Sequence, residues 1–427
     1  MDEGLGTVPR IVGVDLTPLR SVSYRRLYVA GLVTSLGQQA SYVTLPYQLK
    51  QITHSAFAVG VVGLVEVIPL VVGGLYGGFL ADAKDRRRVI IIFELVLALL
   101  TGALVLNSVS SRPSTLVIYG CAFALAAVGA LQRPSIEALN QVLVSADLQR
   151  ASATLANLRY TGASIVGPTV GGLVAVAAGP VWVYLANVAT FVASLYLLGR
   201  LPHVSVSSAI TRPRVVVAEG VRYLRTRPDI IGTYVIDLFA MAWAFPVGML
   251  PFVAAHYSER FALSALYVGL PAGALLATLT SRWTHRVHHY GRAIVGSAVA
   301  WGVGIALFAV ATTLPVALAG LALAGGADAL SGVFRSTLWN ESILPEIRGR
   351  MAGIEMISYS IGPTAGQFRA GAMTVWMSLR ASLALGGIGA AASVGVVALA
   401  LPSLWRFDDR SDSHVAEVRR RRSSPTP

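Results

Sequence analysis

The chain has 427 residues, of which 55% are hydrophobic and 13% are charged, and its mean hydropathy is +0.65. Soluble domains carry about 25% charged residues, so this composition excludes an ordinary soluble protein and is typical of the multi-pass membrane class. In such a protein the net charge of +13 indicates cytoplasmic loops that face anionic lipid, rather than a surface that binds nucleic acid.

Twelve apolar segments follow one another along the chain, and each is long enough to cross a membrane as a helix. This pattern predicts an all-α membrane protein with twelve transmembrane helices. The first segment is too long for a cleaved signal peptide and is interpreted as the first span. The segments lie at 25–49, 56–80, 89–109, 114–143, 151–178, 180–200, 229–255, 262–283, 292–312, 314–343, 351–377 and 380–402.

The basic residues separate between alternate loops. Most of the 34 Lys and Arg residues lie at the two termini and in every second loop, whereas the opposite loops hold only Lys50, Arg112, Arg260 and Arg380. Because positively charged loops are retained in the cytoplasm, both termini are predicted to be cytoplasmic, and the number of spans must be even. The preference for Arg over Lys is compatible with a GC-rich bacterial genome, so we expect a bacterial inner (plasma) membrane.

A basic linker divides the twelve segments into two sets of six. The predicted domains are a cytoplasmic N-terminal segment, a six-helix bundle, a cytoplasmic linker with a short amphipathic helix, a second six-helix bundle and a basic cytoplasmic tail. The two halves echo each other, as in transporters built from parallel repeats around a central cavity. The tail is expected to be disordered and attracted to lipid headgroups. In order, these domains cover 1–24, 25–200, 201–228, 229–404 and 405–427.

The hairpin between the second and third segments carries a recognisable motif. It reads Gly-Gly-Phe-Leu-Ala-Asp-Ala-Lys-Asp-Arg-Arg-Arg, and it resembles the Gly-x-x-x-Asp-x-x-x-Arg-Arg signature of the major facilitator superfamily. Gly78, Asp82, Arg86 and Arg87 occupy the matching positions, while Asp85 replaces the usual central glycine. The resemblance implies a gate that holds the cytoplasmic face shut. The alternative is a topology anchor with no moving role.

A Gly-Pro run occurs in the fifth segment and again in the eleventh. Gly167, Pro168, Gly171 and Gly172 resemble the fifth-span signature of drug:proton antiporters, and Gly362 and Pro363 repeat the pattern. Proline in a helix interior and glycine at its surface predict a kinked, thinned helix. Ordinary close packing is the alternative.

A more specific resemblance covers nearly the whole membrane region. Ala327-Asp-Ala-Leu-Ser-Gly-Val-Phe-Arg335, Leu344-Pro-Glu-Ile-Arg-Gly-Arg350 and Gly366-Gln-Phe-Arg-Ala-Gly371 are similar to the enterobactin-exporter-like branch of that superfamily. The resemblance implies efflux of siderophores or amphipathic drugs by two bundles that rock about a central site. Family members often carry acids in the segment that matches Gln367 and Arg369, and this chain lacks them.

Charged residues inside spans are informative because each costs about 2.5–3.5 kcal/mol at the bilayer centre unless it is paired or faces water. Three acids, Glu66, Asp237 and Asp328, are candidates for proton coupling. The alternative is that each is a structural partner of a buried arginine, for which the candidates are Arg159, Arg335 and Arg369.

The other intramembrane charges have local explanations. Arg133 and Glu137 are four residues apart and are expected to pair. Glu94 and Glu355 lie near cytoplasmic ends, where snorkelling or pairing with loop arginines is expected to satisfy them. Arg335 follows Asp328 by two helical turns, about 11 Å, which is too far for a tight pair without a bridging group.

The sequence therefore predicts a monomeric secondary transporter that exchanges protons for a small molecule within membrane lipids, without nucleic acid. Six polar or aromatic residues are candidates for lining its cavity, although interfacial or core packing explains the two tryptophans equally well. They are Gln38, Gln39, Tyr42, Tyr47, Trp243 and Trp339. No phosphate-binding loop, His-Glu-x-x-His pair or Gly-x-Ser-x-Gly elbow occurs, so we expect no enzyme activity, cofactor or metal. An importer, or a membrane sensor or scaffold that does not transport, remains an alternative.

Overall fold

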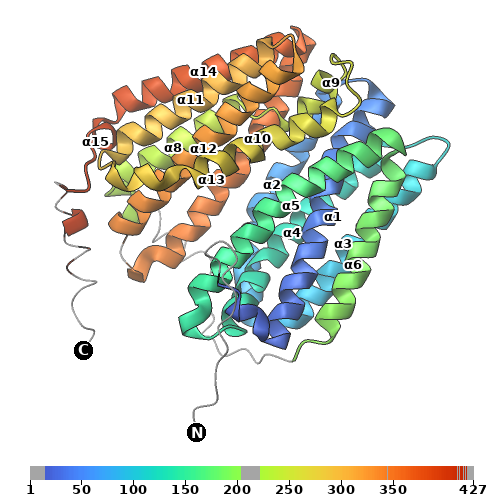
Figure 1. Ribbon diagram of the computed structural model, residues 1–427, viewed down its shortest axis with the longest axis horizontal. Coiled ribbons are helices and arrows are strands. Elements are labelled where there is room, and N and C mark those ends of the chain that lie inside the picture. Colours follow the sequence, from blue (N-terminus) through green and yellow to red (C-terminus); the bar gives the residue numbers. More distant parts are fainter. Residues whose placement is uncertain are drawn as a thin grey trace. The chain divides into compact units, whose positions relative to one another are not determined.

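The computed structural model describes residues 15–202, 222–343 and 345–410, together with 412, 414–416, 418 and 420 of the tail. The side chains of residues 75, 79, 81–83, 146 and 345–358 lie outside this description. All regular secondary structure in the described ranges is helical (Figure 1).

Long helices occupy all twelve predicted segments, with ends that differ from the predicted ones by a few residues in most cases. Ten of them are long and apolar enough to cross a membrane. The arrangement fits the twelve-helix, two-bundle fold. The helices are α1 (Val22–Thr53), α2 (Ala56–Ala83), α3 (Arg86–Val109), α4 (Thr115–Val142), α5 (Gln149–Ala177), α6 (Pro180–Gly199), α8 (Pro228–Trp243), α10 (Ala262–Leu279), α11 (Tyr290–Val310), α12 (Leu314–Ser342), α13 (Pro345–Ala372) and α14 (Leu379–Ala400).

The seventh span is interrupted, whereas the sequence predicted one continuous helix. Helix α8 ends at Trp243, and a single turn at Val247–Met249 leads into the short helix α9 (Leu250–Ala254). Pro246 explains the break, because it removes a backbone donor and disfavours the helical conformation at the preceding residue. The two pieces together still make one candidate span, Pro228–Ala254.

Backbone contacts divide the chain into two compact units. Unit 1 contains Met1–Leu45 and Tyr76–Ile210, and unit 2 contains Pro46–Leu75 and Thr211–Pro427. The end of α1 and most of α2 therefore group with the C-terminal helices. The predicted amphipathic helix of the linker falls mainly on residues 203–221, which lie outside the described residues.

In unit 1, small residues let helices α1 and α5 approach closely. A Cβ atom added at Gly167 would lie 2.6 Å from the Cβ of Gln39, and one added at Gly171 would lie 2.6 Å from the Cα of Ala40. Neither position has room for a side chain. Close approach through glycine is a common way of packing helices in a membrane, where no hydrophobic force drives them together.

Unit 2 uses the same device around α11. A Cβ atom at Gly304 would lie 2.7 Å from the carbonyl oxygen of Gly320 in α12, and one at Gly302 would lie 2.5 Å from that of Gly387 in α14. Helix α2 approaches α13 in the same way, since a Cβ at Gly60 would be 2.9 Å from the Cα of Gly371. These contacts hold together the helices of unit 2, among them α12, which carries charged residues.

The described part of the C-terminal tail packs on unit 2, so the expectation of a disordered tail is wrong for these residues. Val415 and Val418 are fully buried. His288, which follows α10, contacts Asp409 at 2.9 Å. His414 lies 3.2 Å from the carbonyl oxygen of Ser342 at the end of α12. These residues are ordered because apolar side chains of the tail are buried. The many basic residues of the tail hid this apolar pattern in the sequence.

Candidate functional site

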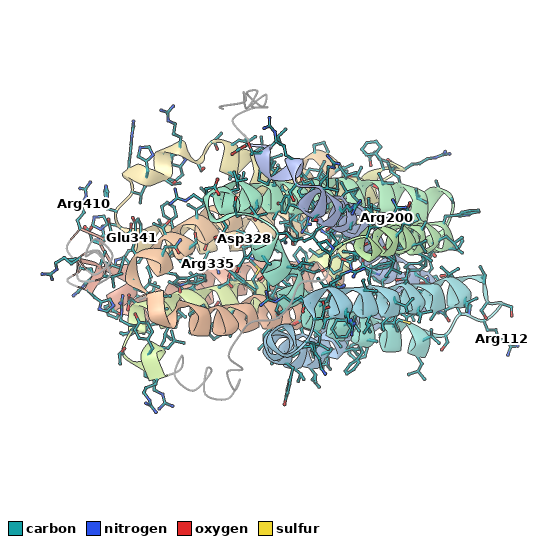
Figure 2. All side chains as sticks on the ribbon, turned by 90° about the horizontal axis from the view of Figure 1, so that it is seen from below. Arg112, Arg200, Asp328, Arg335, Glu341 and Arg410 are labelled. Atoms are coloured by element: carbon teal, nitrogen blue, oxygen red, sulfur yellow. The ribbon has the colours of Figure 1, made fainter. Side chains whose placement is uncertain are left out.

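Three charged side chains from two helices of unit 2 meet in one cluster, which we call the charge cluster: Asp237 of α8, and Asp328 and Arg335 of α12. Figure 2 labels Asp328 and Arg335. The Nη1 atom of Arg335 pairs directly with a carboxylate oxygen of Asp237. Its Nη2 atom lies 3.7 Å from Oδ1 of Asp328. The side chains of Arg335 and Asp237 are 4% and 5% exposed, whereas that of Asp328 is 42% exposed.

The geometry follows from the directions of helical side chains. Side chains on a helix point back toward its N-terminus, so the long arginine reaches toward the acid two turns before it. Although the backbones of Asp328 and Arg335 are two turns apart, the arginine side chain is long enough to reach the carboxylate in a loose contact. Asp237, which α8 brings in from the other side, takes the closer contact, and sequence spacing alone gave no indication of this pair.

Electrostatics makes the cluster sensitive to a single proton. With all three groups ionised the cluster carries one net negative charge, and one added proton makes it neutral. Buried ionised groups are tolerated only when they are paired or reached by water. The Nε atom of Arg335 is buried without a hydrogen-bond partner among the described residues, and the ring of Tyr359 lies 5.5 Å from its guanidinium carbon. Asp328 is the most exposed member of the cluster.

The other two predicted bases, Arg159 and Arg369, are half-buried and have no carboxylate partner within 4 Å in the described ranges. Arg369 donates to the carbonyl oxygen of Ser382 at 3.0 Å and lies 5.8 Å from the ring of Trp243. Arg159 lies against Gly31 and 5.8 Å from the ring of Tyr28. Among the described residues, Arg335 is therefore the one predicted base of the three that pairs with an intramembrane acid.

Glu66 of α2, the third coupling candidate, is half-buried. It belongs to unit 2, as do Asp237 and Asp328. No ion pair to it is formed by the described residues, and its role in coupling stays a prediction.

Glu94 of α3 is a functional candidate that the sequence interpretation misplaced. It was expected to snorkel to the cytoplasmic surface or to pair with loop arginines there, but its side chain is buried inside unit 1. Thr34 donates to one carboxylate oxygen at 2.7 Å, and Gln132 donates to the other at 2.9 Å. Ile90 and Leu97 are buried on the same face of α3, and this helical spacing could have indicated that Glu94 points into the bundle.

Of the remaining intramembrane charges, Arg133 and Glu137 form the pair expected from their spacing, at 3.1 Å. Both side chains are exposed, so the pair contributes little to stability. The side chain of Glu355 lies outside the described part of the structure.

The gate hairpin joins α2 to α3 in unit 1. Its Asp85 caps α3, because a carboxylate oxygen accepts a hydrogen bond from the backbone N–H of Arg88 at 3.2 Å. Arg87 donates to the last carbonyl oxygens of α6, those of Leu198 at 3.2 Å and Gly199 at 2.5 Å. The acid in place of the usual glycine thus has a structural role.

Other members of the gate motif give less information. A Cβ atom at Gly78 would meet nothing within 4 Å, and Arg86 is the first residue of α3. The side chain of Asp82 lies outside the described residues. The proposed gating role is therefore untested by the geometry.

The Gly-Pro runs lie where helices touch. Helices α5 and α13 continue across Pro168 and Pro363. Gly172 is buried near the α1 contact of Gly167 and Gly171, and a Cβ atom at Gly362 would lie 2.8 Å from the Cβ of Met241 in α8. Close packing is present at both runs.

The two tryptophans proposed for the cavity are packed within unit 2. Trp339 donates to the hydroxyl of Thr233 at 2.8 Å and stacks on Tyr234 with ring centroids 5.0 Å apart. Trp243 packs against Gly389 of α14. Trp339 thus borders the helix faces that carry the charge cluster.

The four candidates on α1 differ in burial. Gln38 and Tyr42 are exposed, and Gln39 and Tyr47 are half-buried. Their part in lining a cavity stays a prediction.

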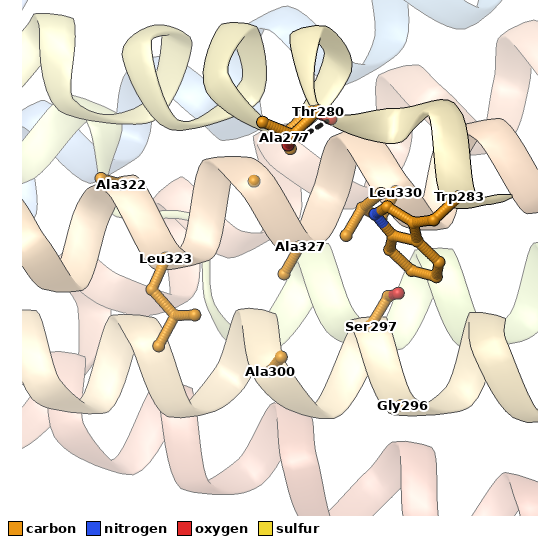
Figure 3. Close-up of a pocket in the computed structure, with 11 residues that line it drawn as sticks. Ala277, Thr280, Trp283, Gly296, Ser297, Ala300, Ala322, Leu323, Ala327 and Leu330 are labelled. Carbon is orange, nitrogen blue, oxygen red and sulfur yellow. Dashed lines mark hydrogen bonds between the residues drawn. The ribbon is translucent and has the colours of Figure 1, made fainter.

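A groove of about 380 Å³ lies between α10, α11 and α12 (Figure 3). Small and apolar side chains such as Ala300, Ala322 and Leu323 line it, together with Trp283. None of its lining residues is charged, so it holds no counter-ion for an ionised ligand. Within the described ranges no group of three His, Cys, Asp or Glu residues is placed to hold a metal ion.

Comparison with known proteins identifies the family. The model of the transmembrane secretion effector family matches residues 14–420. The chain belongs to this family. It is a transporter of the major facilitator superfamily and a multi-pass membrane protein, as the sequence motifs predicted.

Two relatives have a stated substrate. Enterobactin exporter EntS of Salmonella typhimurium strain LT2 is 27% identical over 394 residues, which cover 90% of this chain and 94% of the relative. The protein of the same name from Escherichia coli O1:K1 / APEC is 26% identical over 391 residues, 90% of this chain and 93% of the relative.

Solved structures of similar shape support the fold. The nucleoside transporter NupG is 14% identical with a TM-score of 0.73, covering 90% of this chain and 99% of that protein. A bacterial homologue of the iron transporter ferroportin, in an inward-facing state, is 17% identical with a TM-score of 0.62, covering 90% and 98%.

Proposed function

We propose that this protein is a secondary active transporter that exports a siderophore or another amphipathic small molecule in exchange for protons, by alternating access. The observation that carries the proposal is the charge cluster, in which one buried arginine lies between two carboxylates of different exposure. Such an arrangement has two low-cost charge states that differ by one proton.

The coupling follows from the cost of charge in a membrane. When Asp328 takes up a proton the cluster becomes neutral, and Arg335 keeps only Asp237 as its counter-ion. When Asp328 releases the proton, its carboxylate competes again for the guanidinium. A conformational change that exposes Asp328 alternately to the two sides of the membrane would then carry protons inward, each worth about 2.3 kcal/mol per 100 mV across the full field.

The direction and the substrate class rest on the relatives. Two of them are named enterobactin exporters and match this chain over nine-tenths of its length. We therefore extend their direction of transport to this chain, with enterobactin as the first substrate to test. We further propose that both termini face the cytoplasm of a bacterial cell, that the protein works as a monomer, and that Asp82 and Arg86 close the cytoplasmic side.

Inside-out membrane vesicles test this function. When the vesicle lumen is made acidic, so that the gradient drives protons outward, the vesicles should accumulate enterobactin or an amphipathic dye, and collapsing the gradient should release it. Arg133→Gln, which breaks only the exposed pair, is the matched control and should transport normally. Uptake in whole cells with none in inverted vesicles would favour an importer. If neither whole cells nor inverted vesicles transport the substrate, a sensor or scaffold would be favoured.

A further inference from the structure

A basic pocket of about 630 Å³ opens at one end of unit 2. Three connections form it: those from α1 to α2, from α9 to α10, and from α13 to α14. Lys50, His54 and His256 line it, and none of its eleven lining residues is acidic. By the predicted topology all three connections are on the outer side of the membrane, where basic residues are scarce.

Lys50 is held in a fixed position in this pocket. Its ammonium group donates to the carbonyl oxygen of Pro251 at 2.7 Å and lies 5.4 Å from the centre of the Phe252 ring. No carboxylate of the described residues lies within ion-pair distance of it. An ammonium has three donors, so two remain for a ligand after the bond to Pro251. A half-buried cation that lines a pocket and has no counter-ion among the described residues favours binding of an anion.

Two histidines that line the pocket add donors. His256 lies with Nδ1 3.0 Å from the carbonyl oxygen of Phe252. Because a carbonyl oxygen only accepts, Nδ1 carries the hydrogen, and Nε2 is available to an anion when the ring is protonated. His54 has a φ of 51°, a left-handed conformation that glycine adopts at less cost. A role of the His54 side chain in binding a ligand would explain why histidine, and not glycine, occupies this strained turn.

Two helices also begin at the pocket. Ala56 is the first residue of α2 and Leu379 the first of α14, and both line the pocket. The hydroxyls of Ser55 and Ser378 already cap one N–H of each helix. The dipoles of two long helices add partial positive charge at the same place as Lys50.

We infer that this pocket binds an oxyanion, such as a phosphate or carboxylate group, between Lys50, His54 and His256. The inference is independent of the direction of transport and of proton coupling. Two sources could supply the group: the headgroup of an anionic phospholipid, or a soluble or transported solute with an ionised phosphate or carboxylate. With two histidines and no acidic residue among its lining residues, the pocket lacks a donor set typical of a metal site.

The scarcity of lysine gives a direct test. The chain contains two lysines, Lys50 and Lys84, so in a Lys84→Arg variant Lys50 is the single lysine. Its acylation by an amine-reactive ester is followed by mass spectrometry of the purified protein in nanodiscs of zwitterionic lipid. Inorganic phosphate should slow labelling by the factor 1 + [L]/Kd, about elevenfold at ten times Kd. Chloride at matched ionic strength controls for screening.

Further variants and lipids separate the sources. His54→Gln and His256→Gln should leave Lys50 reactive but reduce protection by phosphate, whereas Arg112→Gln in unit 1 should not change it. Protection in nanodiscs with an anionic phospholipid and no added phosphate assigns the site to a headgroup. Protection by phosphate alone assigns it to a soluble solute. If neither protects, or if chloride protects equally, the inference is wrong.

Discussion

Replacing Asp237 by Asn removes the closest counter-ion of a buried arginine while keeping the shape of the side chain. Arg335 and Asp237 are both almost fully buried. Breaking a buried ion pair by removing one partner costs about 3–5 kcal/mol, because an uncompensated charge stays in the interior. Asp328 at 3.7 Å compensates in part, so we expect Asp237→Asn to fall at the lower end, about 3 kcal/mol.

The neighbouring substitutions set an order. Arg335→Gln leaves two carboxylates without their cation and should cost the most, about 5 kcal/mol. Asp328→Asn should cost less than Asp237→Asn, because its contact is longer and its side chain is partly exposed. The Asp237→Asn/Arg335→Gln double variant should be more stable than the sum of the single changes predicts, since it leaves one carboxylate of the cluster, the partly exposed Asp328, and no buried cation.

Thermal unfolding of the purified variants in one detergent measures this order, with Arg133→Gln as the control that should shift the midpoint little. An Asp237→Asn variant as stable as the parent protein would show that the pair is not a buried ion pair in the folded protein. A larger loss of stability in Asp328→Asn than in Asp237→Asn would show that Asp328, and not Asp237, is the closer partner of Arg335.

Three further substitutions test contacts in unit 1, each by the midpoint of thermal unfolding. Asp85→Ala removes the cap of α3 and should cost about 1 kcal/mol, whereas Asp85→Gly should cost only a few tenths of that; equal losses would argue against the cap. Arg87→Gln should cost about 1 kcal/mol because two carbonyls at the end of α6 lose a donor, and no change would argue against this contact. Glu94→Leu leaves Thr34 and Gln132 without their acceptor and should cost about 1–3 kcal/mol, while Glu94→Gln, which can still hydrogen-bond to both, should cost much less. A loss in Glu94→Gln as large as in Glu94→Leu would mean that the charge, and not the hydrogen bonds, matters.

Most of the fold could be predicted from the sequence because a membrane span imposes strong constraints on length and composition. Apolar runs bounded by arginines located twelve helices, and the signature around Gly78 and Arg86 pointed to the superfamily. The break at Pro246 was missed because prolines are tolerated in many membrane helices, so a proline alone does not indicate whether a helix continues. The order of the tail was missed because its arginines obscured the buried valines.

The site was predictable as a set of residues but not as a set of pairs. Rarity of charge in spans singled out Asp237, Asp328 and Arg335, yet which base meets which acid depends on how α8 and α12 pack. Glu94 was misassigned for the same reason: distance from the helix end was counted, while the face of α3 on which the residue lies decided its partners. Pairing is a tertiary property that spacing on one helix cannot supply.

Substrate-dependent proton movement in proteoliposomes tests the central claim most directly. The purified protein, with a pH-sensitive dye inside the vesicles, should move protons when enterobactin or an amphipathic substrate is added. Asp237→Asn and Asp328→Asn should abolish that movement, and Arg133→Gln should retain it. Proton movement that is unchanged in both aspartate variants would contradict a coupling role for the charge cluster and leave Glu66 as the remaining candidate.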